Sequence, residues 1–140
     1  MRVDGEITRR AEIKGVLHAL YAARLANDPR RVMAFFADNA VFELVGSVEA
    51  SPIACRVEAP HALHSVMVAL CETWEWRSLE VETMLIDGDQ AAISYRLDVR
   101  HLPSGRVVQS QIVDIATLRG SEVVHFKEFV DTAMVLQLSS

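Results

Sequence analysis

Four long segments in which apolar and polar residues alternate occupy the second half of the chain. They read WEWRSLEVETMLI, QAAISYRLDVRH, RVVQSQIVDIATL and EVVHFKEFVD, and together they run from Trp74 to Asp131. The turn signals DGD, LPSG and RGS separate them. Because side chains alternate between the two faces of a strand, this pattern predicts four long strands joined as an antiparallel meander.

The first half of the chain shows helical spacing instead. Residues 6–27 place their apolar side chains on one stripe, which Arg24 interrupts. A second, shorter helix is predicted to begin at Pro29, with Asp28 as its N-cap. A third helix is predicted over PHALHSVMVALCETW, residues 60–74. Three helices therefore precede the meander.

A short strand is predicted over AVFELVG, residues 40–46, and a loop over 47–59. Helices followed by an antiparallel meander indicate an α+β domain. The chain has 140 residues, of which 51% are hydrophobic, and this fits a single domain spanning 1–140 with a substantial core. A long curved meander packed against helices leaves a cavity between the two layers, and small molecules bind in such concave places.

Charge and hydropathy exclude several classes of partner. The net charge is −5 and no basic stripe is present, so we expect no nucleic-acid partner. No apolar run approaches the roughly 18 residues of a membrane span. The first residues contain no apolar signal region, which favours a cytoplasmic protein. Cys55 and Cys71 form no metal or redox motif, and we expect neither a metal nor a cofactor.

The segment YAARLANDPRRVMAFFADNAVFELVG, followed by four long strands ending in VVHFKEFVD, resembles the nuclear-transport-factor-2-like superfamily. That superfamily includes ketosteroid isomerase, SnoaL-type polyketide cyclases and limonene epoxide hydrolase. The resemblance covers nearly the whole chain. It implies a cone-shaped, mostly antiparallel curved sheet packed against three N-terminal helices, with an internal pocket for a small hydrophobic molecule. It also implies a homodimer formed through the outer face of the sheet. The fold hosts many functions, so the activity stays open.

The hairpin YRLDVRHLPSGR is similar to the part of limonene epoxide hydrolase that carries a catalytic Arg-x-Asp, and FKEFVD to the part that supplies its second carboxylate. The resemblance implies that Glu128 activates a water, Asp98 protonates the epoxide oxygen, and Arg96 orients and polarises both. This is the first hypothesis: cofactor-free epoxide hydrolysis. Phe42 and Leu44 stand where that enzyme holds its water with a Tyr and an Asn, so the match is incomplete.

A second correspondence favours proton transfer. IVDIATL is similar to the strand of ketosteroid isomerase that holds its oxyanion-hole aspartate, which falls on Asp114. The base of that enzyme would fall on Leu44, which cannot take a proton, and its tyrosine at or beside Leu20, next to Tyr21. The catalytic aspartate of the SnoaL cyclases matches Glu128 best. The second hypothesis is therefore isomerase- or cyclase-type proton transfer, with Glu128 as base and Asp114 as donor to a developing enolate.

The strand alternation makes both acids unusual. Glu128 is the one charge on a strand face with Val124, Phe126 and Val130, and Asp114 lies among apolar residues on its own strand. Burial raises the pKa of such a carboxyl, and perturbed groups gather at functional sites.

A third hypothesis is a binding protein without catalysis, which the hydrocarbon side chains at positions 42 and 44 favour. The sequence leaves open whether any reaction occurs. The side-chain directions decide among the three hypotheses, because epoxide hydrolysis requires Arg96 and Asp98 to face the cavity together with Glu128. The residues predicted to bind the substrate are Leu20, Tyr21, Arg24, Phe42, Leu44, Ile112, Phe126 and Val130.

Overall fold

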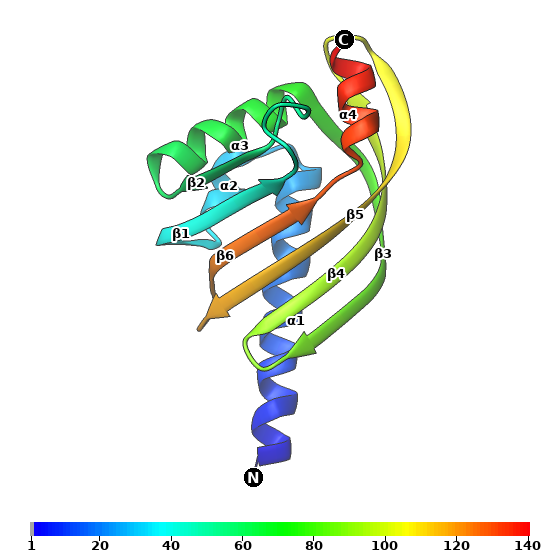
Figure 1. Cartoon of the computed structure of the whole chain (residues 1–140). Helices are drawn as coiled ribbons and strands as arrows, with labels where there is room; N and C mark the ends of the chain where they lie inside the picture. The colour runs from blue at the N-terminus through cyan, green and yellow to red at the C-terminus, as the bar shows by residue number, and fades with distance from the viewer. Residues whose placement is uncertain (1) are drawn as a thin grey trace.

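The structure is a computed structural model that describes residues 2–140, with side chains from residue 5 onward. These residues form four helices and six strands (Figure 1). In chain order they are α1 (Arg2–Leu25), α2 (Pro29–Met33), β1 (Phe36–Val45), β2 (Cys55–Glu58), α3 (His61–Thr73), β3 (Trp74–Asp87), β4 (Gln90–His101), β5 (Arg106–Arg119), β6 (Glu122–Phe129) and α4 (Thr132–Ser139).

The strands form one curved sheet in the order β2-β1-β6-β5-β4-β3. The neighbours β1 and β6 run parallel, and every other neighbouring pair is antiparallel. The meander predicted from the alternation is therefore confirmed, with β4 and β5 beginning at the predicted residues. Gly88 and Gly120 hold the turns of two hairpins at φ 59° and 60°, where a side chain would be strained.

The first three helices lie against one face of the sheet and leave the other face open (Figure 1). The apolar stripe of α1 supplies the fully buried Ile13 and Leu17. The N-cap prediction for α2 is confirmed, because the Asp28 carboxylate accepts a hydrogen bond from the backbone N–H of Arg31 at 3.2 Å. The α+β class and the curved sheet are thus confirmed, and one face of the sheet is closed.

Two elements were missed in the sequence. The predicted loop 47–59 contains β2, a four-residue edge strand that pairs with β1 and is too short to show alternation. The last residues form α4, which buries Val135 and Leu138. Its N-cap is Asp131, whose carboxylate accepts a hydrogen bond from the backbone N–H of Met134 at 3.1 Å.

None of the described helices contains an uncharged apolar stretch long enough to cross a bilayer.

Candidate functional site

A cavity of about 60 Å³ lies between the inner face of the sheet and the helices α1, α2, α3 and α4. Its wall is almost entirely apolar and aromatic, as in small-molecule sites generally. The inward positions of β1 and β6 stack Phe42 on Phe126, with ring centroids 5.8 Å apart. All eight residues predicted to bind substrate line this cavity, and their part in binding stays a prediction: Leu20, Tyr21, Arg24, Phe42, Leu44, Ile112, Phe126 and Val130.

Glu128 is the one acidic residue among the described residues that line the cavity. It sits on β6 with Leu44 of β1 as its neighbour on one side and Asp114 of β5 on the other. Only 8% of Glu128 is exposed, whereas Asp114 is fully buried. Residues directly opposite on antiparallel strands place their Cβ atoms about 5 Å apart, so the two carboxyls meet on the inner face of the sheet.

Two tyrosines from different elements hold Asp114. The hydroxyl of Tyr21 on α1 donates to Asp114 Oδ2 at 2.8 Å, and the hydroxyl of Tyr95 on β4 donates to the same oxygen at 2.7 Å. The Tyr95 hydroxyl also lies 3.5 Å from Glu128 Oε2, a long contact. Asp114 Oδ1 accepts no hydrogen bond from any described donor. A neutral Asp114 that shares its proton with Glu128 accounts for this arrangement.

The surroundings separate the two carboxyls in pKa. Burial raises the pKa of Asp114 well above its ordinary value, and the charge of Glu128 and a hydrogen bond to it raise it further. Burial also raises the pKa of Glu128, but a hydrogen bond from Asp114 and the charge of Arg24 lower it in part. When the pair carries a single negative charge, these effects favour the proton on Asp114 and the charge on Glu128, at the cavity wall. Such a division assigns acid and base roles to neighbouring carboxyls.

Arg24 supplies the positive charge of the site. It is 5% exposed, and its Nη2 donates to the backbone carbonyl of Trp74 at 2.7 Å. Its guanidinium also lies over the ring of Trp76, 4.7 Å from the centroid. Burial lowers the pKa of Arg24, whereas Cys71 and Glu128 raise it. An arginine keeps its proton in proteins, so Arg24 is a buried cation that supports the ionised form of Glu128.

The first hypothesis requires Arg96 and Asp98 to face the cavity, and the structure does not place them there. Both lie on the outer face of β4, whereas their neighbours Tyr95 and Leu97 are buried. Arg96 Nε pairs with Glu82 Oε2 at 3.1 Å, and Asp98 accepts a hydrogen bond from Ser78 at 3.1 Å. The alternation correctly predicts that Arg96 and Asp98 share a face of β4. The helices cover the opposite face, which carries Tyr95 and Leu97. The resemblance to the Arg-x-Asp hairpin therefore does not extend to the side-chain directions.

The sequence did not predict every residue of the site, and the unpredicted residues include Tyr95, Ser110 and Trp74. Tyr95 occupies a buried strand position, where a tyrosine hydroxyl needs a polar partner. Its place in the alternating pattern could therefore have indicated a buried hydrogen bond. Ser110 shares the inward face of β5 with Asp114, as its spacing predicts. Ser110 and Trp74 both line the cavity.

Comparisons with known proteins agree on the fold. The family model described as "SnoaL-like domain" matches residues 17–126. No curated protein matches the chain. A Bacillus subtilis structure provisionally described as an isomerase is 17% identical, with a TM-score of 0.84, and the match covers 94% of each chain.

Two further structures represent other activities. An LEH-like epoxide hydrolase of M. tuberculosis is 14% identical with a TM-score of 0.71, covering 91% of this chain and 89% of that one. A Xanthomonas campestris protein provisionally described as a polyketide cyclase is 15% identical with a TM-score of 0.75, covering 94% and 99%. At these identities the similarity shows a common fold, and the activity has to be argued from the cavity.

Proposed function

The chain belongs to the SnoaL-like domain family, and from the chemistry of its cavity we propose that it catalyses proton transfer at a carbon next to a carbonyl group. The observation that carries the proposal is the carboxylate of Glu128 on an almost entirely apolar cavity wall, with the buried Asp114 beside it on the neighbouring strand. The substrate is a small, largely apolar ketone or polyketone. No cofactor takes part in the proposed chemistry.

In this proposal Glu128 acts as the base. Its carboxylate takes the proton from the carbon, and the C–H electron pair moves into an enolate. For an isomerisation, the substrate is a β,γ-unsaturated ketone, and Glu128 returns the proton to the γ carbon of the conjugated dienolate while the double bond moves to the α,β position. For a cyclisation, the enolate carbon forms a bond to a second carbonyl carbon of the same molecule, and that oxygen takes up the proton. A positioned base of this kind contributes a factor of about 10² to 10⁴ to the rate.

Asp114 has a positioning role rather than the role of direct donor to the enolate. It is fully buried, it is absent from the cavity lining, and its Oδ2 is occupied by two tyrosine hydroxyls. Its proton faces Glu128 in this interpretation, which keeps the base ionised and oriented. Burial and the neighbouring carboxyls raise the pKa values of Tyr21 and Tyr95 well above the ordinary value, so both hydroxyls stay protonated donors.

Proton transfer is better supported than epoxide hydrolysis. Water addition to an epoxide needs a second group at the cavity wall that protonates the departing oxygen. The residue expected in that role, Asp98, lies on the outer face of the sheet, together with Arg96. Isomerisation needs no further acid for a departing oxygen, since the proton that Glu128 removes is the one it returns.

The direct test is exchange of α-protons for deuterium. Phenylacetone in D₂O is expected to exchange its benzylic protons faster with the protein than without it, as followed by proton NMR. The rate should rise with pH through a midpoint above 4.5, the ordinary pKa of a glutamic acid, because the base must be ionised and burial raises its pKa. Absence of protein-dependent exchange across phenylacetone, cyclohexanone and 2-tetralone would contradict the proposal and favour a binding protein without catalysis.

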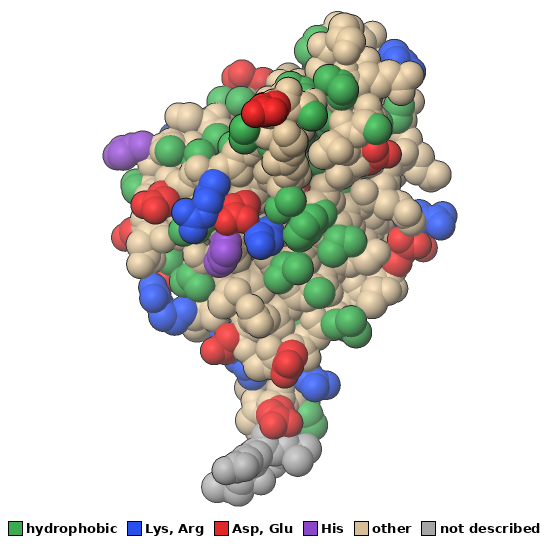
Figure 2. Space-filling view, viewed as in Figure 1, with side chains coloured by type: hydrophobic (Ala, Val, Ile, Leu, Met, Phe, Trp, Pro, Cys, Tyr) green, Lys and Arg blue, Asp and Glu red, His purple; other side chains and the backbone are tan. Residues whose placement is uncertain are grey.

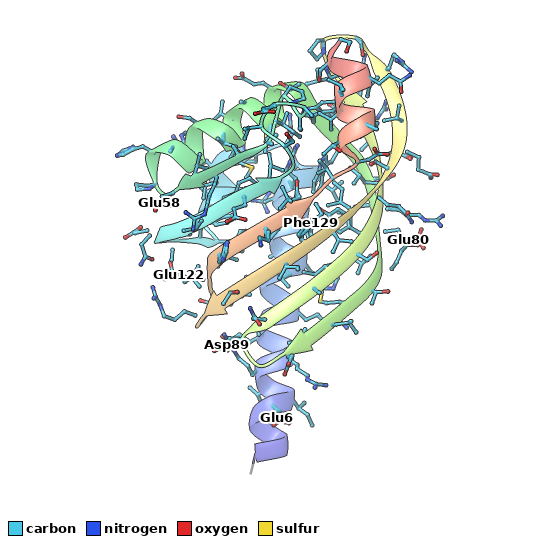
Figure 3. All side chains as sticks on the ribbon, in the orientation of Figure 1. Glu6, Glu58, Glu80, Asp89, Glu122 and Phe129 are labelled. Atoms are coloured by element: carbon cyan, nitrogen blue, oxygen red, sulfur yellow. The ribbon has the colours of Figure 1, made fainter. Side chains whose placement is uncertain are left out.

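We also propose that the outer face of the sheet binds a second copy of the chain. Val113, Ile115 and Phe129 are 41%, 39% and 38% exposed there, and Val113 pairs directly with Phe129. Hydrophobic side chains gather over β5 and β6 in Figure 2, and Figure 3 labels Phe129 at the end of β6. A two-fold axis would set this patch against itself and remove it from water.

The replacement Val113→Glu is expected to convert a dimer into a monomer, because it places two like charges close to the axis of an apolar contact. Light scattering coupled to size exclusion measures the mass directly. Ile7→Glu, at an exposed apolar residue of α1, is the matched control and should leave the mass unchanged. A monomeric wild type at 100 μM, or a dimeric Val113→Glu protein, contradicts the proposed interface.

A further inference from the structure

Two hydrogen-bonding groups on the cavity wall have no partner among the residues that the structure describes. The indole Nε1 of Trp74 and the hydroxyl Oγ of Ser110 are buried, and neither finds a hydrogen-bond partner among the described residues. Trp74 is 5% exposed and Ser110 7%, and both line the cavity. A buried donor without an acceptor destabilises the fold, so native structures rarely contain one without a reason.

Both groups lie on the same side of the acid pair along the strands of the sheet. Ser110 and Asp114 are four residues apart on β5, which corresponds to about 13 Å along a strand. Trp74 pairs with His101, and His101 pairs with Arg106 at the start of β5, so Ser110 lies between the row of Trp74 and the row of Asp114. The base and the two unpartnered donors would therefore contact different parts of one bound molecule.

The charges of the site favour a neutral group at this second position. The positive charge of Arg24 is already balanced by the ionised Glu128, and its Nη2 atom donates to two backbone carbonyls, those of Leu70 and Trp74. A ligand carboxylate would add a second negative charge to a buried cavity that holds one cation, which is unfavourable. The Trp74 N–H can only donate, so its partner must be an acceptor.

We propose that Trp74 and Ser110 bind an uncharged oxygen, a hydroxyl or a carbonyl, on the part of the substrate remote from the carbon that loses its proton. The inference rests on the proposed function for the position of that carbon. It narrows the substrate class to apolar carbonyl compounds with a second oxygen, and it gives these two residues the role of selecting them.

The test compares phenylacetone with 4-hydroxyphenylacetone, which differ by one remote oxygen. We expect the wild type to prefer the hydroxylated ketone about tenfold, both in kcat/KM for deuterium exchange and in Kd by calorimetry, as one buried hydrogen bond allows. Trp74→Phe and Ser110→Ala should each reduce that preference several-fold, measured as the ratio of the two ketones within each variant. Ser78→Ala, on the outer face of the sheet, should keep the full preference.

The outcomes separate this inference from the proposed function. Exchange of both ketones at equal rates, or an unchanged preference in both variants, overturns the role of Trp74 and Ser110 and leaves the proton transfer standing. If the wild type exchanges neither ketone, the proposed function fails. The calorimetric Kd values alone then test whether Trp74 and Ser110 bind the remote oxygen. Tighter binding of the hydroxylated ketone that both variants weaken then supports the polar site, whereas equal binding or no binding overturns it.

Discussion

Glu128→Gln is expected to lower the rate of α-proton exchange by a factor of about 10² to 10⁴, because an amide cannot accept the proton that the carboxylate removes. Glutamine has nearly the same shape as glutamate and can still accept the contact from the Tyr95 hydroxyl. The replacement also removes a buried charge, so the variant should unfold at the same temperature as the wild type or higher. The measurement is proton NMR of phenylacetone in D₂O.

The matched control is Glu122→Gln, which makes the same chemical change at the exposed start of β6 (Figure 3). This variant should exchange at the wild-type rate. Similar rates for Glu128→Gln and Glu122→Gln would remove Glu128 from the mechanism, even if the protein exchanges protons at another group.

Asp114→Asn is expected to make the protein more stable than the wild type, by a margin that grows with pH. An acid whose pKa is raised on folding holds its proton in the folded state while the unfolded chain releases it. Its stabilising contribution is complete below the ordinary pKa of 3.8 and is lost as the pH rises toward the folded-state pKa. Asparagine has no such proton. The difference in the free energy of unfolding should therefore increase above pH 4, by at most about 1.4 kcal/mol per pH unit, until the pH reaches the folded-state pKa.

Urea unfolding followed by circular dichroism at several pH values between 4 and 7 measures this difference. Asparagine can still accept the tyrosine hydrogen bonds and donate to Glu128, so the buried network is preserved. Asp98→Asn is the control, since that carboxylate lies on the outer face of the sheet and accepts from Ser78. A difference for Asp114→Asn that does not change with pH would show that Asp114 is ionised in the folded protein.

Much of the architecture could be predicted from the sequence because the signals are local. The strand alternation located the meander, and Asp28 with Pro29 marked the start of α2. The elements that were missed are those whose local signal is weak. The strand β2 has four residues and depends on pairing with β1, and α4 is a short helix stabilised by packing of Val135 and Leu138.

The candidate site could be predicted in part. Glu128 and Asp114 stood out because each interrupts an apolar strand face, and both are indeed buried on the inner face of the sheet. The hydrogen-bond partners of Asp114 could not be predicted, because Tyr21 lies 93 residues away in the chain and Tyr95 lies on a neighbouring strand. Sequence spacing describes one element at a time and contains no information on which hydroxyl reaches which carboxyl.

The sequence by itself determined which side chains share a face of each strand, because the alternation of the backbone is a local property of the chain. It placed Arg96 and Asp98 together and Ser110 with Asp114. Only the tertiary structure decided which of the two faces the helices close. That choice depends on burying the apolar stripes of α1 and α3 against the face that carries Tyr95, Leu97 and Phe126. It left Arg96 in water and enclosed Glu128.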